Sequence, residues 1–529
     1  WLPRRAFTFS YAAPGASGVV RAAALPTSGG GTPAGGAEYL YVKHASGPRQ
    51  PLHEPAAVLP VPSHFARDRI LLPATLAAVL LTLLAVRPHL GVPLNDDFSY
   101  AHTARALAES GRIVYNGWAS PMLWPQAAYG ALLIKAFGFS YTALAASGIV
   151  LAALATATMY ALARACGAGP APAALATATL TLNPIFLGVT PSFMTDVPSL
   201  FLLLAALLAL VKALQPGEAG DTRLDPKRFA LSVVLGLVAG SNRQIVWVAY
   251  FGALVTLIWL LPRQRRLVAP AAVLVLVIAL ALSRWFGDYP YTVPTSVGQG
   301  LLVLVGYTNV AVMFIYKVAN MMGLFSLPMG LLAMDKRRWR SLAFGVLLLL
   351  CLVPIFYPLG TKVALLGRDY RLTAYGQYFT SRGVVVGGVS GFENRPTIFP
   401  PLIITACVVL GAVGVAVTGI VLLDWWRGLR RTGSQARTLP DVATSAVAVA
   451  SLASVAASLP WFAIMNIFDR YLLLYLPGLL VLFARAASER PMTKTRIAAA
   501  ATLLAVQWVT GYGTVAEYMN YTRARAALY

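Results

Sequence analysis

Two adjacent carboxylates, Asp96 and Asp97, follow the first long apolar run of this 529-residue chain. An ionised carboxylate beside hydrocarbon is costly, so acids at the ends of membrane helices are by default candidates for a functional site. A third acid, Asp196, begins another apolar run, and Arg243 and Arg470 lie at the ends of later ones. In such a group, a carboxylate can take a proton from a hydroxyl, and an arginine can hold an anion such as phosphate.

Each of these residues also has a structural explanation. Asp97 can cap a short helix expected over 98–110. Asp196 stands at the start of a long apolar helix, where an N-cap is expected. Arg243 and Arg470 can lie along apolar surface and place their charge at the membrane interface. The sequence alone leaves these explanations open beside the catalytic one.

The composition indicates a helical membrane protein. Hydrophobic residues make up 58% of the chain and charged residues 12%, with a mean hydropathy of +0.68. A soluble protein of this length would need more polar surface. Apolar runs recur, and a run of about twenty residues crosses roughly 30 Å of hydrocarbon as a helix. Because unpaired backbone groups are not tolerated in lipid, we expect an all-α polytopic fold.

About thirteen runs are predicted to cross the membrane. They cover 70–86, 141–164, 171–189, 196–214, 229–242, 246–262, 267–286, 301–333, 341–361, 399–425, 441–463, 469–487 and 495–513. The segment 124–138 is expected to lie on the outer surface as a juxtamembrane helix instead. Residues suited to the headgroup level accompany it: Trp118, Trp124, Tyr129 and Lys135.

The distribution of charge predicts the orientation. The net charge is +23, but the basic residues fall in short clusters between apolar runs, around 263–266, 336–340, 427–437 and 485–496. Such clusters in alternate loops follow the positive-inside rule and do not indicate a nucleic-acid partner. We therefore expect a multi-pass protein of the plasma (inner) membrane, with a cytoplasmic N-terminus and an extracytoplasmic site. If 124–138 crossed, this regular alternation would be lost.

The remaining segments are not expected to add a site. Residues 1–66 lack periodicity and are rich in Pro, Gly, Ala and Ser, so we expect a disordered tail before a transmembrane domain over 67–529. The tail has no continuous apolar stretch before a cleavage site, so no signal peptide is expected. A later outer loop, with arginines at 368, 371 and 382, is expected to be solvated surface.

The cysteines and histidines indicate no metal centre. Cys166, Cys351 and Cys407 are far apart, and the five histidines are scattered. Neither a disulfide framework nor a zinc spacing can be built from them. We therefore expect no bound metal and no cofactor.

Transfer of a sugar from a lipid phosphate needs carboxylates beside arginines at a membrane face. A carboxylate takes the proton of an acceptor hydroxyl as the hydroxyl oxygen attacks the anomeric carbon. Cations hold the phosphate and stabilise the charge that develops as it departs. Arginine suits this role because its planar fork binds two phosphate oxygens.

Several motifs resemble one family. The stretch Asn95-Asp96-Asp97-Phe98-Ser99-Tyr100-Ala101, followed by a short helix and Gly111, resembles the first outer loop of the GT-C glycosyltransferases. The nearest group contains protein O-mannosyltransferases and the lipid A aminoarabinose transferase, as in glycosyltransferase family 39. Phe193-Met194-Thr195-Asp196-Val197-Pro198 is similar to the second-loop acid of that group, and Asn242-Arg243-Gln244 to its basic outer turn. Asp469-Arg470-Tyr471-Leu472-Leu473 matches more weakly, and coverage is best over about 90–265, the expected catalytic half.

The resemblance implies a mechanism. Members of this group use polyprenyl- or dolichyl-phosphate sugars and invert the anomeric carbon. Asp96 would then be the base, with Asp97 in support, and Asp196 would line the cavity and orient the acceptor or the base. Arg243 and Arg470 would contact the donor phosphate. Other expected substrate-binding residues are Tyr100, Lys135 and Asn242.

The acceptor would be a hydroxyl on a lipid, a glycan or a protein. The alternative function is a transporter or flippase of a lipid-linked or anionic substrate, another class that places charge inside helical bundles. Transporters commonly have repeated halves around a midplane site, whereas these acids gather toward one face and no internal repeat is evident. An outward-facing cavity with both Asp96 and Asp196 would favour the transferase.

Overall fold

The computed structural model of the protein describes residues 63–217, 222–293, 308–356, 401–431, 437–459 and 469–527. All of these residues belong to one unit, Val61–Tyr529. The predicted tail up to residue 62 and the predicted outer loop with its arginines at 368, 371 and 382 lie outside the described residues.

Eight stretches within the described ranges are long and apolar enough to cross a membrane. They lie in α1 (Ser63–Val86), α4 (Tyr141–Ala165), α7 (Asp196–Ala213), α10 (Arg265–Asp288), α12 (Thr308–Ala333), α14 (Pro401–Arg431), α15 (Leu439–Ser458) and α16 (Leu472–Ser488). Each coincides with a predicted run. The polytopic helical fold is therefore confirmed, whereas the count of thirteen crossings is not.

Other predicted runs form helices that are not among these eight stretches. These helices are α8 (Pro226–Asn242), α9 (Ile245–Leu260), α13 (Trp339–Phe356) and α17 (Lys494–Ala526). The run 171–189 is divided into α5 (Pro170–Thr181) and α6 (Pro184–Val189). Pro184 cannot continue the first helix because it lacks an N–H, and the Asn183 side chain accepts the N–H groups of the next helix at 2.9 Å.

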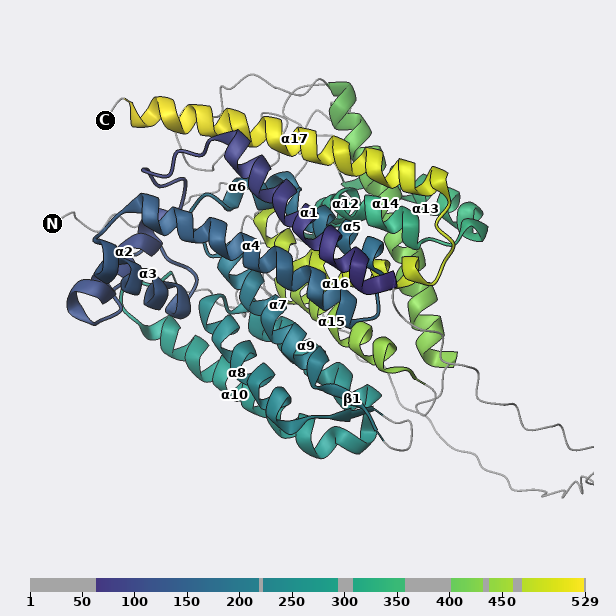
Figure 1. The fold of residues 1–529 in the computed structure, drawn as a ribbon, viewed down its shortest axis with the longest axis horizontal. Helices are drawn as coiled ribbons and strands as arrows, with labels where there is room; N and C mark the ends of the chain where they lie inside the picture. The colour runs from purple at the N-terminus through teal and green to yellow at the C-terminus, as the bar shows by residue number, and fades with distance from the viewer. Residues whose placement is uncertain are drawn as a thin grey trace, which may run out of the picture. The chain divides into compact units, whose positions relative to one another are not determined.

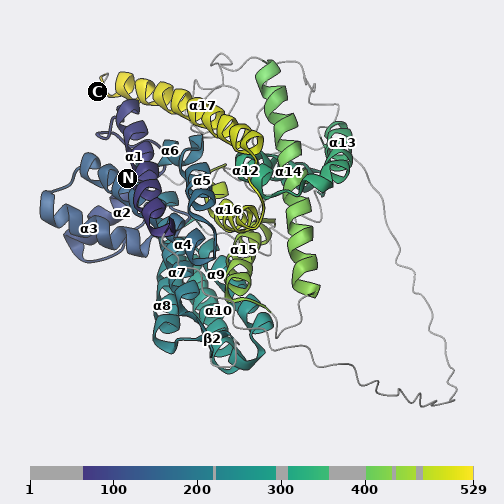
Figure 2. The same cartoon turned by 45° about the vertical axis from the view of Figure 1, so that its right-hand side comes forward.

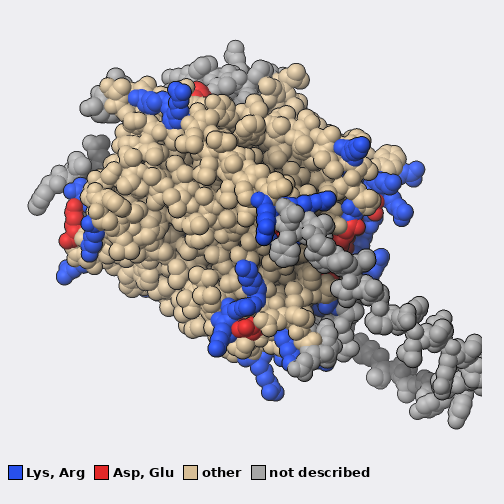
Figure 3. Space-filling model, in the orientation of Figure 1, with Lys and Arg blue, Asp and Glu red and all other residues tan. Residues whose placement is uncertain are grey.

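Basic residues gather at one of the two ends of the bundle. Here a short antiparallel hairpin, β1 (Leu214–Pro216) with β2 (Thr222–Leu224), joins α7 to α8. Side chains also link helix ends that are far apart in sequence. The Ser488 hydroxyl accepts the Gly169 N–H at 2.8 Å, and the guanidinium carbon of Arg437 lies 5.2 Å from the Trp259 ring centroid. Figure 3 shows charged side chains toward the ends and a broad uncharged area between them.

The opposite end holds the first loop, with α2 (Asp97–Ser110) and α3 (Trp124–Phe137) side by side (Figure 1). Helix α2 ends as predicted at Gly111, whose φ of 70° is a left-handed conformation that suits glycine. Both ends of α3 lie at this end of the bundle. Before it, the Leu123 N–H donates to the Asn242 carbonyl at 3.3 Å, and after it α4 begins at Tyr141. Helix α3 therefore does not cross the bundle, as predicted for 124–138.

Helix α16 lies inside the bundle and contacts α15, α12 and α5 (Figures 1 and 2). Its residues from Leu472 to Ala484 are buried on every side. Gly478 allows the close approach to α15, because a Cβ at this position would lie 2.1 Å from the Val447 carbonyl oxygen. This packing fixes the short helix η5 (Asp469–Tyr471), which precedes α16 at the end where the first loop lies.

The shared end predicts how engineered cysteines are labelled. Ser110→Cys and Thr142→Cys flank α3 at exposed positions and should react with a membrane-impermeant maleimide from the same side of the membrane. Met492→Cys, exposed between α16 and α17, should react only from the other side. The native Cys166, Cys351 and Cys407 would first be replaced by alanine. Labelling of Ser110→Cys and Thr142→Cys from opposite sides would contradict the arrangement.

Candidate functional site

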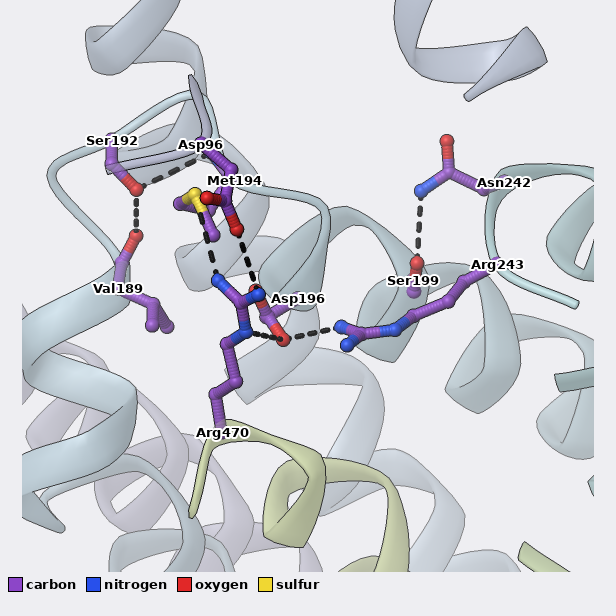
Figure 4. A network of polar contacts seen from close by, with 9 residues as sticks. All are labelled: Asp96, Val189, Ser192, Met194, Asp196, Ser199, Asn242, Arg243 and Arg470. Carbon is purple, nitrogen blue, oxygen red and sulfur yellow. Dashed lines mark hydrogen bonds and ion pairs between the residues drawn. The ribbon is translucent and has the colours of Figure 1, made fainter. Parts of the chain in front are cut away.

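Asp96 occupies the N-cap position of α2, but its side chain accepts no hydrogen bond from that helix. One carboxylate oxygen accepts from the Arg470 guanidinium at 2.8 Å, and the other accepts from the Trp118 indole N–H at 2.9 Å. The contact between Asp96 and Arg470 joins the first loop to η5, more than 370 positions later in the chain. Two of the predicted site residues therefore meet directly (Figure 4).

Asp196 is the second acid of the cluster and the first residue of α7. One of its oxygens forms an ion pair with Arg243, which follows α8, and lies 3.9 Å from Nε of Arg470. The other oxygen, Oδ2, is buried and has no hydrogen-bond partner within the described part of the chain. Arg470 therefore contacts both Asp96 and Asp196 through different nitrogens (Figure 4).

The cluster is buried most deeply at Asp196. The side chain of Asp196 is 1% exposed and that of Arg470 is 5%, whereas the Asp96 side chain keeps 17%. Arg243, at 8%, lies with its guanidinium carbon 4.2 Å from the Tyr471 ring centroid. Both guanidinium groups are buried and form ion pairs with carboxylates, which the snorkelling explanation does not predict. Asp96 is the acid of this cluster that a substrate reaches most easily.

Asp97 and Asp196 do not act as the predicted helix caps. Helix α7 has Thr195 at its N-cap position and no side-chain cap, and α2 begins at Asp97 itself. The Asp97 carboxylate instead accepts the N–H groups of Asn95 at 2.7 Å and Leu94 at 3.2 Å, which lie before the helix. Asp97 therefore folds the chain into the turn that presents Asp96, and it makes no contact with either arginine of the cluster.

Burial raises the pKa of Asp97 to about 6. Its hydrogen bonds to backbone N–H groups oppose this increase, and the neighbouring charge of Asp96 adds to it. The Asp97 side chain thus has the strongly shifted acidity that is common at functional sites, although its contacts describe a positioning role.

Asn242 connects three elements around the cluster. Its side-chain amide donates to the Ser199 hydroxyl at 2.9 Å, and its side-chain oxygen accepts the Gln126 N–H at 3.2 Å. Gln126 in turn donates to the Phe193 carbonyl at 2.6 Å. This network holds α3 against the chain segment before Asp196 and the turn before Arg243. Asn242 is fully buried, so its contacts place the ion pair of Asp196 with Arg243.

Tyr100 and Lys135, the other two predicted substrate-binding residues, lie at different distances from the charge cluster. Tyr100 is buried in α2, and burial together with the charge of Asp96 raises its pKa well above the ordinary value. The charges of Arg470, Arg243 and Asp196 also act on this phenol, which places it beside the cluster. Lys135 is exposed near the end of α3 and has no contact with these residues. The structure therefore brings Tyr100 to the site and does not bring Lys135 there.

Sequence reasoning did not identify two residues that hold the site. Trp118 was expected at the headgroup level, and no spacing relates it to Asp96 in the sequence. Gln126 lies in a segment that reads as apolar, yet it is 1% exposed and hydrogen-bonded. The presence of a glutamine within an apolar helix is the one feature of the sequence that could have indicated a buried polar contact at this position. Across the described ranges, no group of three His, Cys, Asp or Glu residues is arranged to hold a metal ion.

Comparison with known families identifies one match. Residues 125–285 match the family described as dolichyl-phosphate-mannose-protein mannosyltransferase, over less than a third of the chain. The matched part contains Asp196 and Arg243 and leaves out Asp96 and Arg470. This match to a family of glycosyltransferases confirms the resemblance that the sequence motifs predicted. No curated protein matches the chain.

Solved structures give weaker similarities. The apo crystal structure of the Archaeoglobus fulgidus oligosaccharyltransferase aligns at 14% identity and a TM-score of 0.45, over 86% of this chain and 56% of that one. The crystal structure of ArnT from Cupriavidus metallidurans bound to undecaprenyl phosphate aligns at 15% identity and a TM-score of 0.32, over 83% and 77%. This chain thus spans little more than half the length of the oligosaccharyltransferase.

The raised pKa of Asp97 predicts a pH-dependent stability. Because the folded pKa of about 6 lies above the ordinary value of 3.8, the folded state holds this proton more tightly. Stability should therefore fall as pH rises from about 4 to about 6, by roughly 3 kcal/mol for this group. Relative to Asp97→Asn, the thermal midpoint of the wild type should decrease across this range. A midpoint difference that does not change with pH would contradict the assignment.

A matched control is Glu109→Gln, which alters an exposed acid of the same helix. Glu109 pairs with Arg105 at 2.7 Å, and both side chains are more than half exposed. Exposed pairs contribute little to stability. The midpoint difference between this variant and the wild type should stay nearly constant over the same pH range.

Proposed function

We propose that this chain is a membrane glycosyltransferase that transfers a sugar from a polyprenyl-phosphate-linked donor to an acceptor hydroxyl, with inversion. The observation that carries the proposal is the contact of one guanidinium, Arg470, with both Asp96 and Asp196 at one end of the helical bundle. This arrangement supplies a reachable carboxylate and two arginines within one cluster. The family match supports the donor class, because dolichyl-phosphate-mannose is itself a polyprenyl-phosphate-linked sugar.

Asp96 acts as the general base. Each of its oxygens accepts one hydrogen bond, from Arg470 or from Trp118, and a carboxylate oxygen can accept a second. The acceptor hydroxyl donates to Asp96 and transfers its proton as its oxygen bonds to the anomeric carbon. The bond from the anomeric carbon to the phosphate oxygen breaks, and its electron pair leaves with the polyprenyl phosphate. Attack from the face opposite the phosphate inverts the anomeric centre.

Arg243 and Arg470 stabilise the departing phosphate. The donor phosphodiester carries one negative charge, and the released phosphate monoester carries more, so nearby cations favour the transition state over the bound donor. Both guanidinium groups already pair with carboxylates. A donor phosphate therefore shares them with Asp96 and Asp196, using the further N–H donors that a guanidinium has. Asp196, the most deeply buried acid of the cluster, contacts both arginines and orients them.

The site lies on the extracytoplasmic side of the plasma membrane in this proposal. The basic clusters that the positive-inside rule assigns to the cytoplasm lie at the other end of the bundle, near Gly169, Ser488 and Arg437. The N-terminus is then cytoplasmic. The region 90–265 supplies Asp96, Asp196 and Arg243, and η5 completes the site with Arg470.

The test is transfer by the purified full chain with a panel of radiolabelled polyprenyl-phosphate sugars. Hydroxyl acceptors of each class, lipid, glycan and peptide, are supplied with each donor. Product from one donor, together with release of polyprenyl phosphate, is the expected result. Movement of an intact lipid-linked substrate across a vesicle membrane without product would support a flippase instead and contradict the proposal.

Loss of the base should abolish most transfer. Asp96→Asn keeps the shape of the side chain but removes its basicity, which typically lowers the rate by about 100-fold to 10,000-fold. The variant should still fold and insert, because Arg470 retains its contact with Asp196. Asp288→Asn is the control, since Asp288 is an exposed acid near the same end, paired with Arg284 at 3.2 Å. Equal rates for Asp96→Asn and wild type would remove Asp96 from the mechanism.

A further inference from the structure

Trp118 is an exposed aromatic residue beside the candidate base. Its side chain is attached to the loop between α2 and α3, and the residue is 57% exposed. A tryptophan that anchors a protein at the membrane interface directs its N–H toward water or headgroups. Here the indole N–H donates to Asp96 instead, at 2.9 Å. The open part of Trp118 is therefore its ring, held next to the carboxylate.

Phe98 extends this aromatic surface. Phe98 is 38% exposed, and its ring centroid lies 5.9 Å from that of Trp118, with an angle of 51° between the ring planes. Phe98 follows Asp97 directly in α2, so both rings flank the turn that presents Asp96. Together, Trp118 and Phe98 form an exposed apolar shelf at the outer edge of the buried charge cluster.

The loop that carries Trp118 is held in place from behind. The Tyr115 hydroxyl donates to the Met122 carbonyl at 2.5 Å, and the Tyr115 ring packs edge-on against Phe286 at 5.4 Å between centroids. Gly117, with a φ of 80°, donates its N–H to the Tyr291 carbonyl at 2.7 Å. A side chain at position 117 would be strained in this left-handed conformation. The position of Trp118 is therefore fixed without a bound ligand.

Polar groups border the shelf. Asn116 is exposed, and its side-chain oxygen accepts from the Ser99 hydroxyl at 2.6 Å, so its amide NH₂ remains able to donate. Asp96, the most exposed charge of the cluster, accepts the Trp118 N–H and therefore also lies beside the shelf. An apolar surface with a hydrogen-bond donor and an acceptor beside it matches a sugar ring, which has apolar C–H faces and hydroxyls around its edge.

We propose that Trp118 and Phe98 form an acceptor subsite that binds a sugar ring, so that the acceptor is a glycan or glycolipid whose free hydroxyl faces Asp96. This inference rests on the proposed function and narrows its acceptor class. A protein acceptor fits less well. Extended peptides commonly bind by adding a strand to a sheet edge, and the described strands, β1 and β2, lie at the opposite end of the bundle.

Trp118 has a second role in this proposal, as a positioning residue. Its N–H fixes one oxygen of Asp96 while Arg470 fixes the other. The ring and the N–H can be separated by mutation. Trp118→Phe keeps an aromatic ring and removes the N–H, whereas Trp118→Ala removes both. The first change should affect the rate of transfer, and the second should also affect acceptor binding.

The test uses the full chain in lipid nanodiscs that contain no sugar-based detergent. Binding is measured by saturation-transfer NMR with methyl α-mannopyranoside, methyl β-glucopyranoside and a capped Ser/Thr peptide as probes. Wild type should transfer saturation to the ring protons of a glycoside, and Trp118→Ala should weaken this binding about tenfold. Trp118→Phe should retain it. Phe137→Ala is the control, because Phe137 is an aromatic residue 74% exposed at the end of α3.

Kinetics then test the positioning role. With the donor that the wild type uses, Trp118→Phe should lower kcat while leaving the acceptor KM nearly unchanged, and Trp118→Ala should raise the acceptor KM as well. Binding of the peptide but of neither glycoside, or equal glycoside binding by Trp118→Ala and wild type, would overturn the subsite. Failure of every donor in the transfer assay would overturn the proposed function instead, and the NMR measurement would still decide on the subsite.

Discussion

The site depends on the guanidinium of Arg470, which is buried between two carboxylates from different parts of the chain. Taking charges out of water is costly, and a buried cation is tolerated only when its partners are well placed. Arg470 meets this condition through Asp96 at 2.8 Å and Asp196 at 3.9 Å. Removing one partner leaves Arg470 paired with a single carboxylate. The first loop, the start of α7 and η5 are therefore held together by one side chain.

The surrounding helices make this arrangement possible. Helix α16 is buried along its length, so Arg470 is presented from the interior of the bundle and not from a surface loop. From the other side, the network of Gln126, Asn242 and Ser199 holds α3 against α7 and the turn before Arg243. The rigid parts of the fold thus place the arginines, while the loop with Asp96 and Trp118 forms the more accessible side. The deeply buried arginines are suited to the phosphate of a lipid-linked donor. The more exposed Asp96 is suited to an acceptor that arrives from outside the membrane.

The charged residues of the site could be predicted from the sequence because charge is rare in apolar segments. Asp96, Asp196, Arg243 and Arg470 all stand at the ends of apolar runs, and a single orientation rule places them at one end. Their partners could not be predicted in the same way. Which carboxylate meets which arginine depends on how helices pack, and Asn183 with Pro184 divides a run that reads as one span. The indole hydrogen bond of Trp118 to Asp96 likewise depends on the path of a loop, which hydropathy does not record.

The central claim is that Asp96 and Asp196 act as one unit through Arg470. The most direct measurement is a double-mutant cycle on the rate of transfer, with Asp96→Asn, Asp196→Asn and the double variant assayed with a radiolabelled donor. Residues that act as a unit show strongly non-additive losses. We predict that the double variant loses no more than about tenfold beyond the more damaging single variant. A double variant whose loss equals the product of the two single losses would show that the two carboxylates act independently.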